Sequence, residues 1–274
     1  MDLLIQGLVM GIVQGLTEFL PISSSGHLII VPFLLGWNDP FITSLAFSVM
    51  LHVGTLVALL VYFRADWVRL VPAGLSAIRD RSFHADPDRR LAWLLVTATI
   101  PGAIAGFLLN DVIEAQFREA GLVAVTLVIG AVILWLADRW GARTKGIEDV
   151  TFPQAAGFGL AQAIALVPGI SRSGISISAA RLAGLDREAA ARFSFLMATP
   201  ITAGAAIFEV RKLATGEAGV AVSVGPLVVG LIAAFVAGMF AIGIMLRYLR
   251  TRSLTIFVVY RLILAVVVIV VWLR

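Results

Sequence analysis

The pentapeptide Ile22-Ser-Ser-Ser-Gly26 returns later in the chain, with one change, as Ile170-Ser-Arg-Ser-Gly174. The same spacing relates Gly11 to Gly159, so the repeat extends beyond the pentapeptide. Each copy follows a proline and places serine and glycine inside an otherwise apolar stretch. Hydrocarbon tolerates irregular polar backbone only where that backbone lines a polar cavity. The repeat therefore predicts two halves of one polar site.

The composition is that of an integral membrane protein. Hydrophobic residues make up 60% of the 274 residues and charged residues 14%, which leaves too little polar surface for a soluble globule of this size. The apolar runs are long and do not alternate as barrel strands do, which predicts an all-α protein. The net charge of +4 is spread over short loops and does not indicate nucleic-acid binding. The absence of cysteine excludes disulfides and thiolate chemistry.

Six apolar segments reach the roughly 20 residues that a helix needs to cross a bilayer. They are residues 41–63, 91–109, 121–137, 190–210, 224–246 and 254–273. Two further segments, 3–35 and 154–184, are broken at Pro21 and Pro168 into halves that are too short to cross. We expect these two segments to form re-entrant, broken-helix hairpins.

Basic residues gather in three loops, which are residues 64–90, 138–152 and 247–253. Such loops are predicted to be cytoplasmic, and the intervening loops to face outward. Repeat one (1–137) and repeat two (152–274) would each contain one hairpin and three spans. An odd number of spans inverts the second copy, so residues 1–274 are predicted to form one membrane domain with an inverted-topology repeat. The broken helices of such repeats meet near the bilayer midplane, so we expect the two serine motifs to face each other.

The four-residue spacing in Gln14-Gly-Leu-Thr-Glu18 puts an amide and a carboxylate on one face of a helix. Glu18 is then an ionisable group at membrane depth, which is costly unless it pairs with a charge, a metal or a proton-transfer partner. We interpret Glu18 as a functional acid or metal ligand. The alternative is a glutamate solvated at a helix end near the surface.

The segment Ser23, Ser24, Ser25, Gly26 and His27 supplies three hydroxyls and an imidazole where a half-helix should begin. The N–H groups at a helix N-terminus favour phosphate oxygens, and histidine exchanges protons near neutral pH. This composition predicts an anion cradle. Taken alone, the motif would equally fit a serine N-cap with an incidental histidine.

The second motif, Pro168-Gly-Ile-Ser-Arg-Ser-Gly174, has Arg172 at the position that Ser24 holds in the first. A guanidinium engages phosphate at two points and stays charged at any working pH. We therefore predict that Arg172 is a clamp for a multi-oxygen anion. The alternative is an arginine that snorkels or merely pairs with Glu18.

Together these residues fit phosphoryl transfer on a lipid-borne diphosphate. Glu18 would act as acid or metal ligand with help from Gln14, Ser24 as nucleophile, His27 as acid or base, and Arg172 as charge clamp. A divalent cation, Mg²⁺ or Ca²⁺, would bridge the diphosphate and Glu18, because hard cations prefer oxygen ligands. The other candidates for contacts with phosphate are Gln14, Ser23, Ser25, Gly26, Gly169, Ser171, Ser173, Gly174 and Ser176.

Two more ionisable residues lie inside apolar spans. His52 either neighbours the site or forms a neutral interhelical hydrogen bond. Arg261 lies about two turns from the cytoplasmic end of the last span, and we expect it to snorkel or pair rather than to act on substrate.

With these motifs in place, the chain resembles the bacterial undecaprenyl-diphosphate phosphatase family, which is linked to bacitracin resistance. The resemblance rests on the segment from Gln14 to His27 together with the one from Pro168 to Gly174, and it covers essentially the whole chain. It implies a multi-pass inner-membrane hydrolase that converts undecaprenyl diphosphate to undecaprenyl phosphate and inorganic phosphate. That reaction recycles the lipid carrier for peptidoglycan synthesis. The resemblance also implies a homodimer whose site opens to the periplasmic side.

Carried over by position, the family's Glu/Gln-x-x-x-Glu motif falls on Gln14 and Glu18, its serine and histidine on Ser24 and His27, and its phosphate-binding arginine on Arg172. The first position is the glutamine variant, which leaves Glu18 as the main acidic ligand. Serine occupies two places, Ser25 and Ser176, where relatives often have threonine. The hydroxyl is kept at both.

We expect in-line attack on the terminal phosphorus by Ser24, activated by His27, followed by hydrolysis of a phosphoserine. Direct attack by a water that His27 activates is the nearest alternative. The non-enzymatic alternative is a transporter or lipid flippase, because inverted repeats with broken helices are also a transporter architecture.

Overall fold

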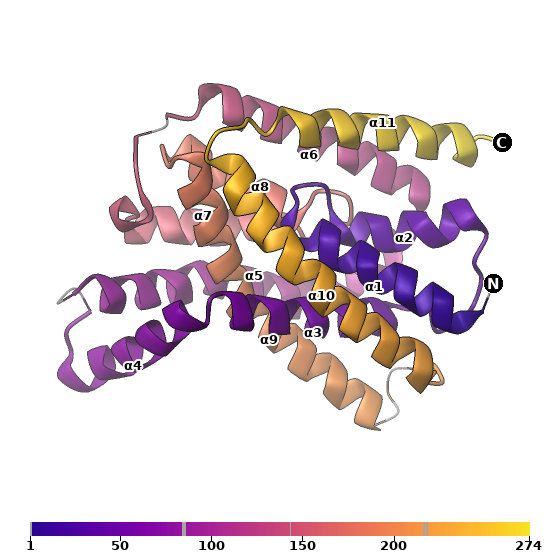
Figure 1. Cartoon of the computed structure of the whole chain (residues 1–274), viewed down its shortest axis with the longest axis horizontal. Helices are drawn as coiled ribbons and strands as arrows, with labels where there is room; N and C mark the ends of the chain where they lie inside the picture. The colour runs from indigo at the N-terminus through magenta and orange to yellow at the C-terminus, as the bar shows by residue number, and fades with distance from the viewer. Residues whose placement is uncertain (1, 84–85, 143, 216, 218) are drawn as a thin grey trace.

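The computed structural model describes residues 2–83, 86–142, 144–215, 217 and 219–274, and this part of the chain contains helices but no β-strand (Figure 1). The α-helices in chain order are α1 (Leu3–Phe19), α2 (Ser24–Leu35), α3 (Leu45–Tyr62), α4 (Arg64–Asp80), α5 (Pro87–Gln116), α6 (Ala120–Trp140), α7 (Phe152–Ile164), α8 (Arg172–Leu182), α9 (Arg187–Thr215), α10 (Val224–Leu249) and α11 (Thr255–Trp272). A short 3₁₀ turn, η1 (Ile147–Asp149), precedes α7.

The predicted fold class is confirmed. Within the described residues, six helices are long and apolar enough to cross a membrane, and each coincides with one of the six predicted spans. These helices are α3, α5, α6, α9, α10 and α11. The largest differences in length are at α5 and α9, which continue past the predicted ends to Gln116 and Thr215.

The predicted loop 64–90 is wrong in part, because most of it is the helix α4. This helix is amphipathic, with Val68, Val71 and Leu75 exposed and Leu70 buried. The segment has arginines at both ends, which is typical of a cytoplasmic connection, and this pattern therefore predicts a loop. That prediction overlooks the helical spacing of its apolar residues.

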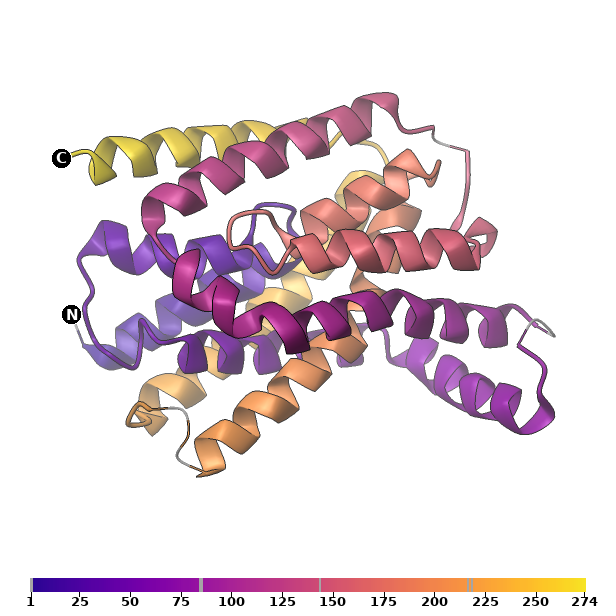
Figure 2. The same ribbon diagram turned by 180° about the vertical axis from the view of Figure 1, so that it is seen from behind.

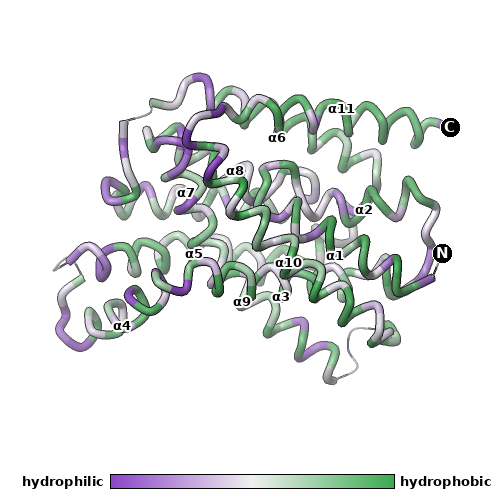
Figure 3. Tube along the Cα trace, viewed as in Figure 1, coloured by the Kyte–Doolittle hydropathy of each residue, from purple (hydrophilic) through white to green (hydrophobic). Residues whose placement is uncertain are grey.

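The three basic connections lie at one end of the helix bundle and both termini at the other (Figures 1 and 2). Hydrophilic residues are concentrated at the first of these ends (Figure 3). Ion pairs join two of these connections to the start of α9, with Arg187 bound to Asp138 at 2.6 Å and Arg250 to Glu188 at 2.9 Å. The arrangement agrees with the expected sidedness, although the cytoplasmic orientation itself stays a prediction.

Close packing against α10 fixes the position of α1. A Cβ added at Gly7, Gly11 or Gly15 would overlap the backbone of α10. Glycines spaced four apart thus form a smooth face along α1 that lets two helix backbones approach, as small residues commonly do in membrane proteins. This packing places the C-terminal end of α1, with Gln14 and Glu18, in the interior.

Two helical hairpins enter the bundle from opposite ends, and their loops meet in the middle (Figures 1 and 2). The first consists of α1 and α2, and the second of α7 and α8. This arrangement is compatible with the predicted re-entrant hairpins and with the division into repeats 1–137 and 152–274. The inverted topology relative to a membrane stays a prediction.

Candidate active site

The two serine loops share one local structure. Ser23 has φ 75° and ψ 92°, and Ser171 has φ 78° and ψ 112°. In each loop this serine is the N-cap of the following helix, and its Oγ accepts from the backbone N–H of Gly26 (3.3 Å) or Gly174 (3.0 Å). A positive φ at a residue other than glycine costs of order 1–3 kcal/mol and persists where surrounding contacts enforce it, commonly at functional sites.

Direct contacts join the two loops. The backbone N–H of Gly169 donates to Ser23 Oγ at 3.2 Å, and Ser173 Oγ donates to the carbonyl of Leu20 at 3.0 Å. At Gly26, an added Cβ would lie 3.4 Å from Gly169 Cα, so the two loop backbones approach to about van der Waals distance of a side chain there. The two motifs therefore face each other, as the repeat predicted.

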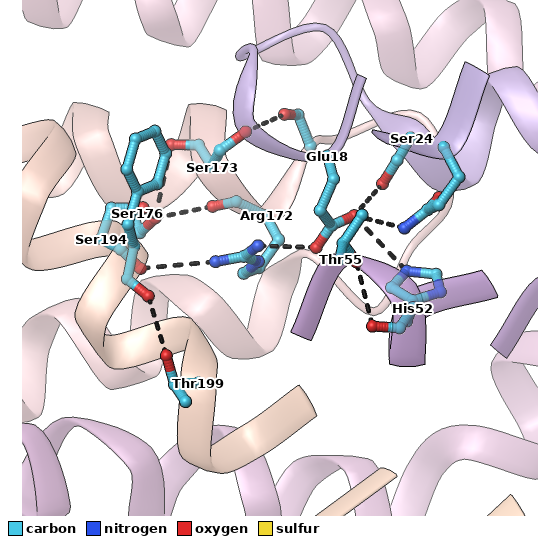
Figure 4. A network of polar contacts seen from close by, with 12 residues as sticks. Glu18, Ser24, His52, Thr55, Arg172, Ser173, Ser176, Ser194 and Thr199 are labelled. Carbon is cyan, nitrogen blue, oxygen red and sulfur yellow. Dashed lines mark hydrogen bonds and ion pairs between the residues drawn. The ribbon is translucent and has the colours of Figure 1, made fainter. Parts of the chain in front are cut away.

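Glu18 is the centre of the polar network between the loops (Figure 4). Its Oε1 accepts from Arg172 Nη2 at 2.6 Å, and its Oε2 accepts from Ser24 Oγ at 2.5 Å and Gln14 Nε2 at 3.0 Å. His52 Nε2 lies 3.5 Å from the same Oε2. Because Glu18 is only 6% exposed, the alternative of a surface-solvated glutamate is wrong. One buried carboxylate thus joins residues from both repeats.

Arg172 begins α8 and pairs with Glu18, while its Nη1 donates to the carbonyl of Ser194 at 3.3 Å. Ser176 contacts the same residue, because its Oγ lies 2.6 Å from Ser194 Oγ. The side chain of Arg172 is still 17% exposed. A guanidinium has five N–H donors, so these contacts leave donors available for an anion.

His27 is next to this network but forms no hydrogen bond with Glu18, Ser24 or Arg172. Its Nδ1 is 2.7 Å from the carbonyl of Ser23, and its Nε2 is 2.7 Å from the hydroxyl of Tyr260. A carbonyl can only accept, so in the neutral imidazole Nδ1 carries the hydrogen and Nε2 accepts from the tyrosine. Ser24 donates to Glu18 and forms no hydrogen bond with His27 in this structure. Activation of Ser24 by His27 therefore stays a prediction.

His52 neighbours the site. Its Nδ1 donates to the carbonyl of Ser48 at 2.8 Å, which turns Nε2 toward Glu18. A cavity of about 110 Å³ lies beside it, and its polar lining comes from Ser25, Ser48, His52 and Arg118. The sequence left two interpretations of His52 open, and this geometry favours the one that involves the site.

Two neighbouring residues of α11 reach the loops. Sequence reasoning missed Tyr260, and it singled out Arg261 without linking it to the site. Tyr260 hydrogen bonds to His27 and stacks on it with a ring-centroid distance of 5.6 Å. Arg261 has 0% exposure and donates to backbone carbonyls of both serine loops. The expectation that Arg261 snorkels or pairs is therefore wrong, because its head group is buried and, within the described residues, binds carbonyls rather than a carboxylate. A charge inside an apolar span was the signal that singled out Arg261, but that signal does not show which groups the arginine binds.

The oxygens around Glu18 fit part of the coordination shell of a hard divalent cation. Gln14 Oε1 is buried without a hydrogen-bond partner, beside the carboxylate that Gln14 Nε2 contacts. The described residues contain no cluster of three Asp, Glu, His or Cys side chains. Mg²⁺ is often held by one or two protein oxygens together with substrate phosphate and water, and Glu18 with Gln14 suits that mode.

Two opposed helical hairpins and a buried carboxylate, hydroxyl and guanidinium where they meet define a polytopic membrane protein with a polar site in its interior. The chain belongs to the family described as bacitracin resistance protein BacA, which matches residues 7–267.

Curated relatives cover almost the full chain. The chain is 46% identical over 266 residues to the undecaprenyl-diphosphatase of Desulforudis audaxviator (strain MP104C), covering 97% of both chains. It is 47% identical over 263 residues to that of Gemmatimonas aurantiaca, covering 96% of both, and 44% identical over 271 residues to that of Moorella thermoacetica, covering 98% of both.

Proposed function

We propose that this protein hydrolyses undecaprenyl diphosphate to undecaprenyl phosphate and inorganic phosphate. The reaction would recycle the lipid carrier for peptidoglycan synthesis and confer bacitracin resistance. The family and the names of its relatives support the substrate. The structural observation that carries the proposal is that Ser24 of one loop and Arg172 of the other bind the same buried carboxylate, Glu18.

The diphosphate headgroup would bind between the loops while its polyprenyl chain stays among the helices. Arg172 retains free donors and partial exposure, so it can bind the terminal phosphate without leaving Glu18. The helices α2 and α8 begin at Ser24 and Arg172, and their N-termini contribute partial positive charge at the same place. We propose the cavity lined by Ser25 and His52 as the route of the headgroup.

In the proposed reaction, Ser24 Oγ attacks the terminal phosphorus in line with the bridging oxygen, and the hydroxyl proton passes to Glu18, which accepts its hydrogen bond. The bond between that phosphorus and the bridging oxygen breaks, and undecaprenyl phosphate leaves with the electron pair. Glu18 orients the hydroxyl through the 2.5 Å hydrogen bond, and Arg172 stabilises charge on the phosphoryl oxygens. Water then hydrolyses the phosphoserine and releases inorganic phosphate, with His27 as the proton-transfer candidate. Direct attack by water remains the alternative.

A divalent cation, Mg²⁺ or Ca²⁺, is part of the proposal. Glu18 and Gln14 would hold it together with diphosphate oxygens, where it would neutralise charge on the headgroup. Gln14 Oε1 supports this role because it is a buried acceptor with no hydrogen-bond partner.

We also propose that the protein resides in the bacterial inner membrane as a homodimer with the site open to the periplasm. The six apolar helices support a multi-pass protein. The gathering of basic connections at one end supports the sidedness through the positive-inside rule.

Release of inorganic phosphate from undecaprenyl diphosphate by the purified, detergent-solubilised protein tests the proposal. The assay is run with Mg²⁺ or Ca²⁺, with chelator, and with the Arg172→Ala variant. Arg192→Ala is the matched control, because Arg192 pairs with Asp66 at the basic end of the bundle. We expect metal-dependent release that Arg172→Ala loses and Arg192→Ala keeps. No release by folded, metal-supplied wild type would contradict the phosphatase and favour the transporter.

A further inference from the structure

Arg261 connects three segments that are far apart in the sequence. Its Nε donates to the carbonyl of Leu127 in α6 at 3.1 Å, and its Nη1 to the carbonyl of Pro21 in the first serine loop at 3.3 Å. Its Nη2 donates to the carbonyls of Gly169 and Ile170 in the second loop at 2.8 and 3.0 Å. A planar fork of five donors can serve four carbonyls at once, whereas an ammonium group has three donors on one atom.

The surrounding backbone leaves space for this guanidinium. A Cβ at Gly130 in α6 would overlap Arg261 Nη2, and a Cβ at Gly174 in α8 would lie 3.1 Å from Nη1. Any side chain at Gly130 would therefore displace the arginine. Glycines in α6 and α8 therefore leave room for the guanidinium of Arg261.

The guanidinium of Arg261 is fully buried, and within the described residues no carboxylate lies within ion-pair distance of it. Taking an ion out of water is unfavourable even after the surroundings relax. Four backbone carbonyls offset part of that cost here. An apolar residue at this position of α11 would avoid the cost altogether, so packing of the last span does not account for an arginine.

The carbonyls that Arg261 binds lie directly before the two helix starts that carry the chemistry. Pro21 is two residues before the N-cap Ser23, and Ile170 immediately precedes the N-cap Ser171. Holding these carbonyls therefore holds the starts of α2 and α8 relative to each other. Those starts are Ser24 and Arg172.

We infer that Arg261 is a positioning residue of the phosphatase site, which aligns Ser24 of one serine loop with the phosphate bound by Arg172 of the other. The inference rests on the proposed function. Arg261 touches neither Ser24 nor Glu18 through any hydrogen bond, so it acts through the loops. A displacement of reacting groups by about 1 Å can lower turnover about a hundredfold.

The test compares Arg261→Lys with Arg181→Lys in the phosphate-release assay. Arg181 is the matched control because it is also fully buried and donates to backbone carbonyls, those of Gly141, Ala142 and Leu185, at the C-terminal end of α8. Unlike Arg261, it also has a carboxylate nearby, that of Asp138 at 3.6 Å. We expect Arg261→Lys to lower kcat about a hundredfold with little change in KM, because alignment is lost while Arg172 still binds phosphate. Arg181→Lys should lose similar thermal stability and keep its kcat.

Three results would overturn the inference while wild type remains active: an unchanged kcat in Arg261→Lys, a rise in KM alone, or an equal loss of kcat in Arg181→Lys. If Arg261→Lys does not fold, Gly174→Ala serves instead, because its methyl group would lie 3.1 Å from Arg261 Nη1 and would shift the guanidinium without removing it. A normal kcat in that variant would also contradict the inference. Inactive wild type would instead count against the proposed function.

Discussion

The two serine loops have the same backbone and different side chains. In each, a serine with positive φ caps the helix that follows, and a second serine lies two residues on, with hydroxyl separations of 3.4 Å in the first loop and 3.3 Å in the second. By sequence position, Glu18, Ser24 and His27 align with Leu166, Arg172 and Ile175. The same loop structure thus occurs twice, with the carboxylate, hydroxyl and imidazole in the first copy and the arginine guanidinium in the second.

This division suits hydrolysis. A phosphoryl group needs a nucleophile and a charge clamp on different sides, and two opposed loops provide them without either loop carrying both. A transporter that moves its cargo between two equivalent halves has no need of this asymmetry. Substitutions at matched positions of the two copies therefore test the comparison directly.

Ser24→Ala should have the largest effect. If Ser24 is the nucleophile, its loss should lower kcat about a thousandfold or more, because the neighbouring hydroxyls do not contact Glu18. Single-turnover phosphate release measures this, and Ser25→Ala, which should lose far less, is the matched control. Near-normal turnover of Ser24→Ala would eliminate serine attack and leave an activated water.

Arg172→Lys tests the second copy. Lysine keeps the charge but loses the planar fork, so the phosphate would lose at least one charge-assisted hydrogen bond. Such a bond contributes about 1.5–3 kcal/mol, which corresponds to a roughly 10- to 100-fold loss of kcat/KM. The measurement is steady-state kinetics beside Arg192→Lys. Full activity in Arg172→Lys would mean that charge alone suffices and that the fork has no role.

Sequence reasoning found Glu18, Ser24 and Arg172 because polar residues stand out in an apolar chain and the repeat pairs them. Spacing along a helix gives the face of a side chain, so the sequence alone predicted that Gln14 lies next to Glu18, and the two side chains do hydrogen bond. The same reasoning could not find Tyr260, because a tyrosine near a helix end is ordinary in a membrane protein.

Arg261 shows the other limit of the sequence. Its position in the span gives a depth in the membrane, and at that depth an arginine can snorkel or bind buried groups. Which of these occurs depends on whether other segments, here Pro21 and Ile170, bring carbonyls within reach. Contacts between distant segments are a tertiary property. The helix α4 was missed for a local reason, because its arginines were interpreted only as a charge signal.

Gln14→Glu should sharpen the metal assignment. At present the amide Nε2 of Gln14 donates to Glu18 at 3.0 Å. The substitution replaces this amide with a second carboxylate, and two carboxylates bind a hard cation more tightly than one. We expect the Mg²⁺ concentration for half-maximal activity to fall about tenfold. An unchanged metal dependence would mean that the cation does not bind at this pair.

Gln162→Leu should have the smallest effect on catalysis. Gln162 aligns with Gln14, yet both polar atoms of its side chain are buried without hydrogen-bond partners, and Leu166 replaces the carboxylate that Glu18 supplies in the first copy. An unsatisfied buried amide costs about 1–3 kcal/mol, so leucine should raise the thermal stability in detergent.

The kcat of Gln162→Leu should stay within about twofold of wild type, because the Gln162 side chain forms no hydrogen bond with any residue of the site. Phosphate release and thermal unfolding of the same preparation give both quantities. A tenfold loss of kcat in a stable Gln162→Leu protein would show that the second copy contributes more than Arg172 and its loop. In that case the division of labour between the two loops would be wrong, and a function shared equally by the two halves, as in a transporter, would regain support.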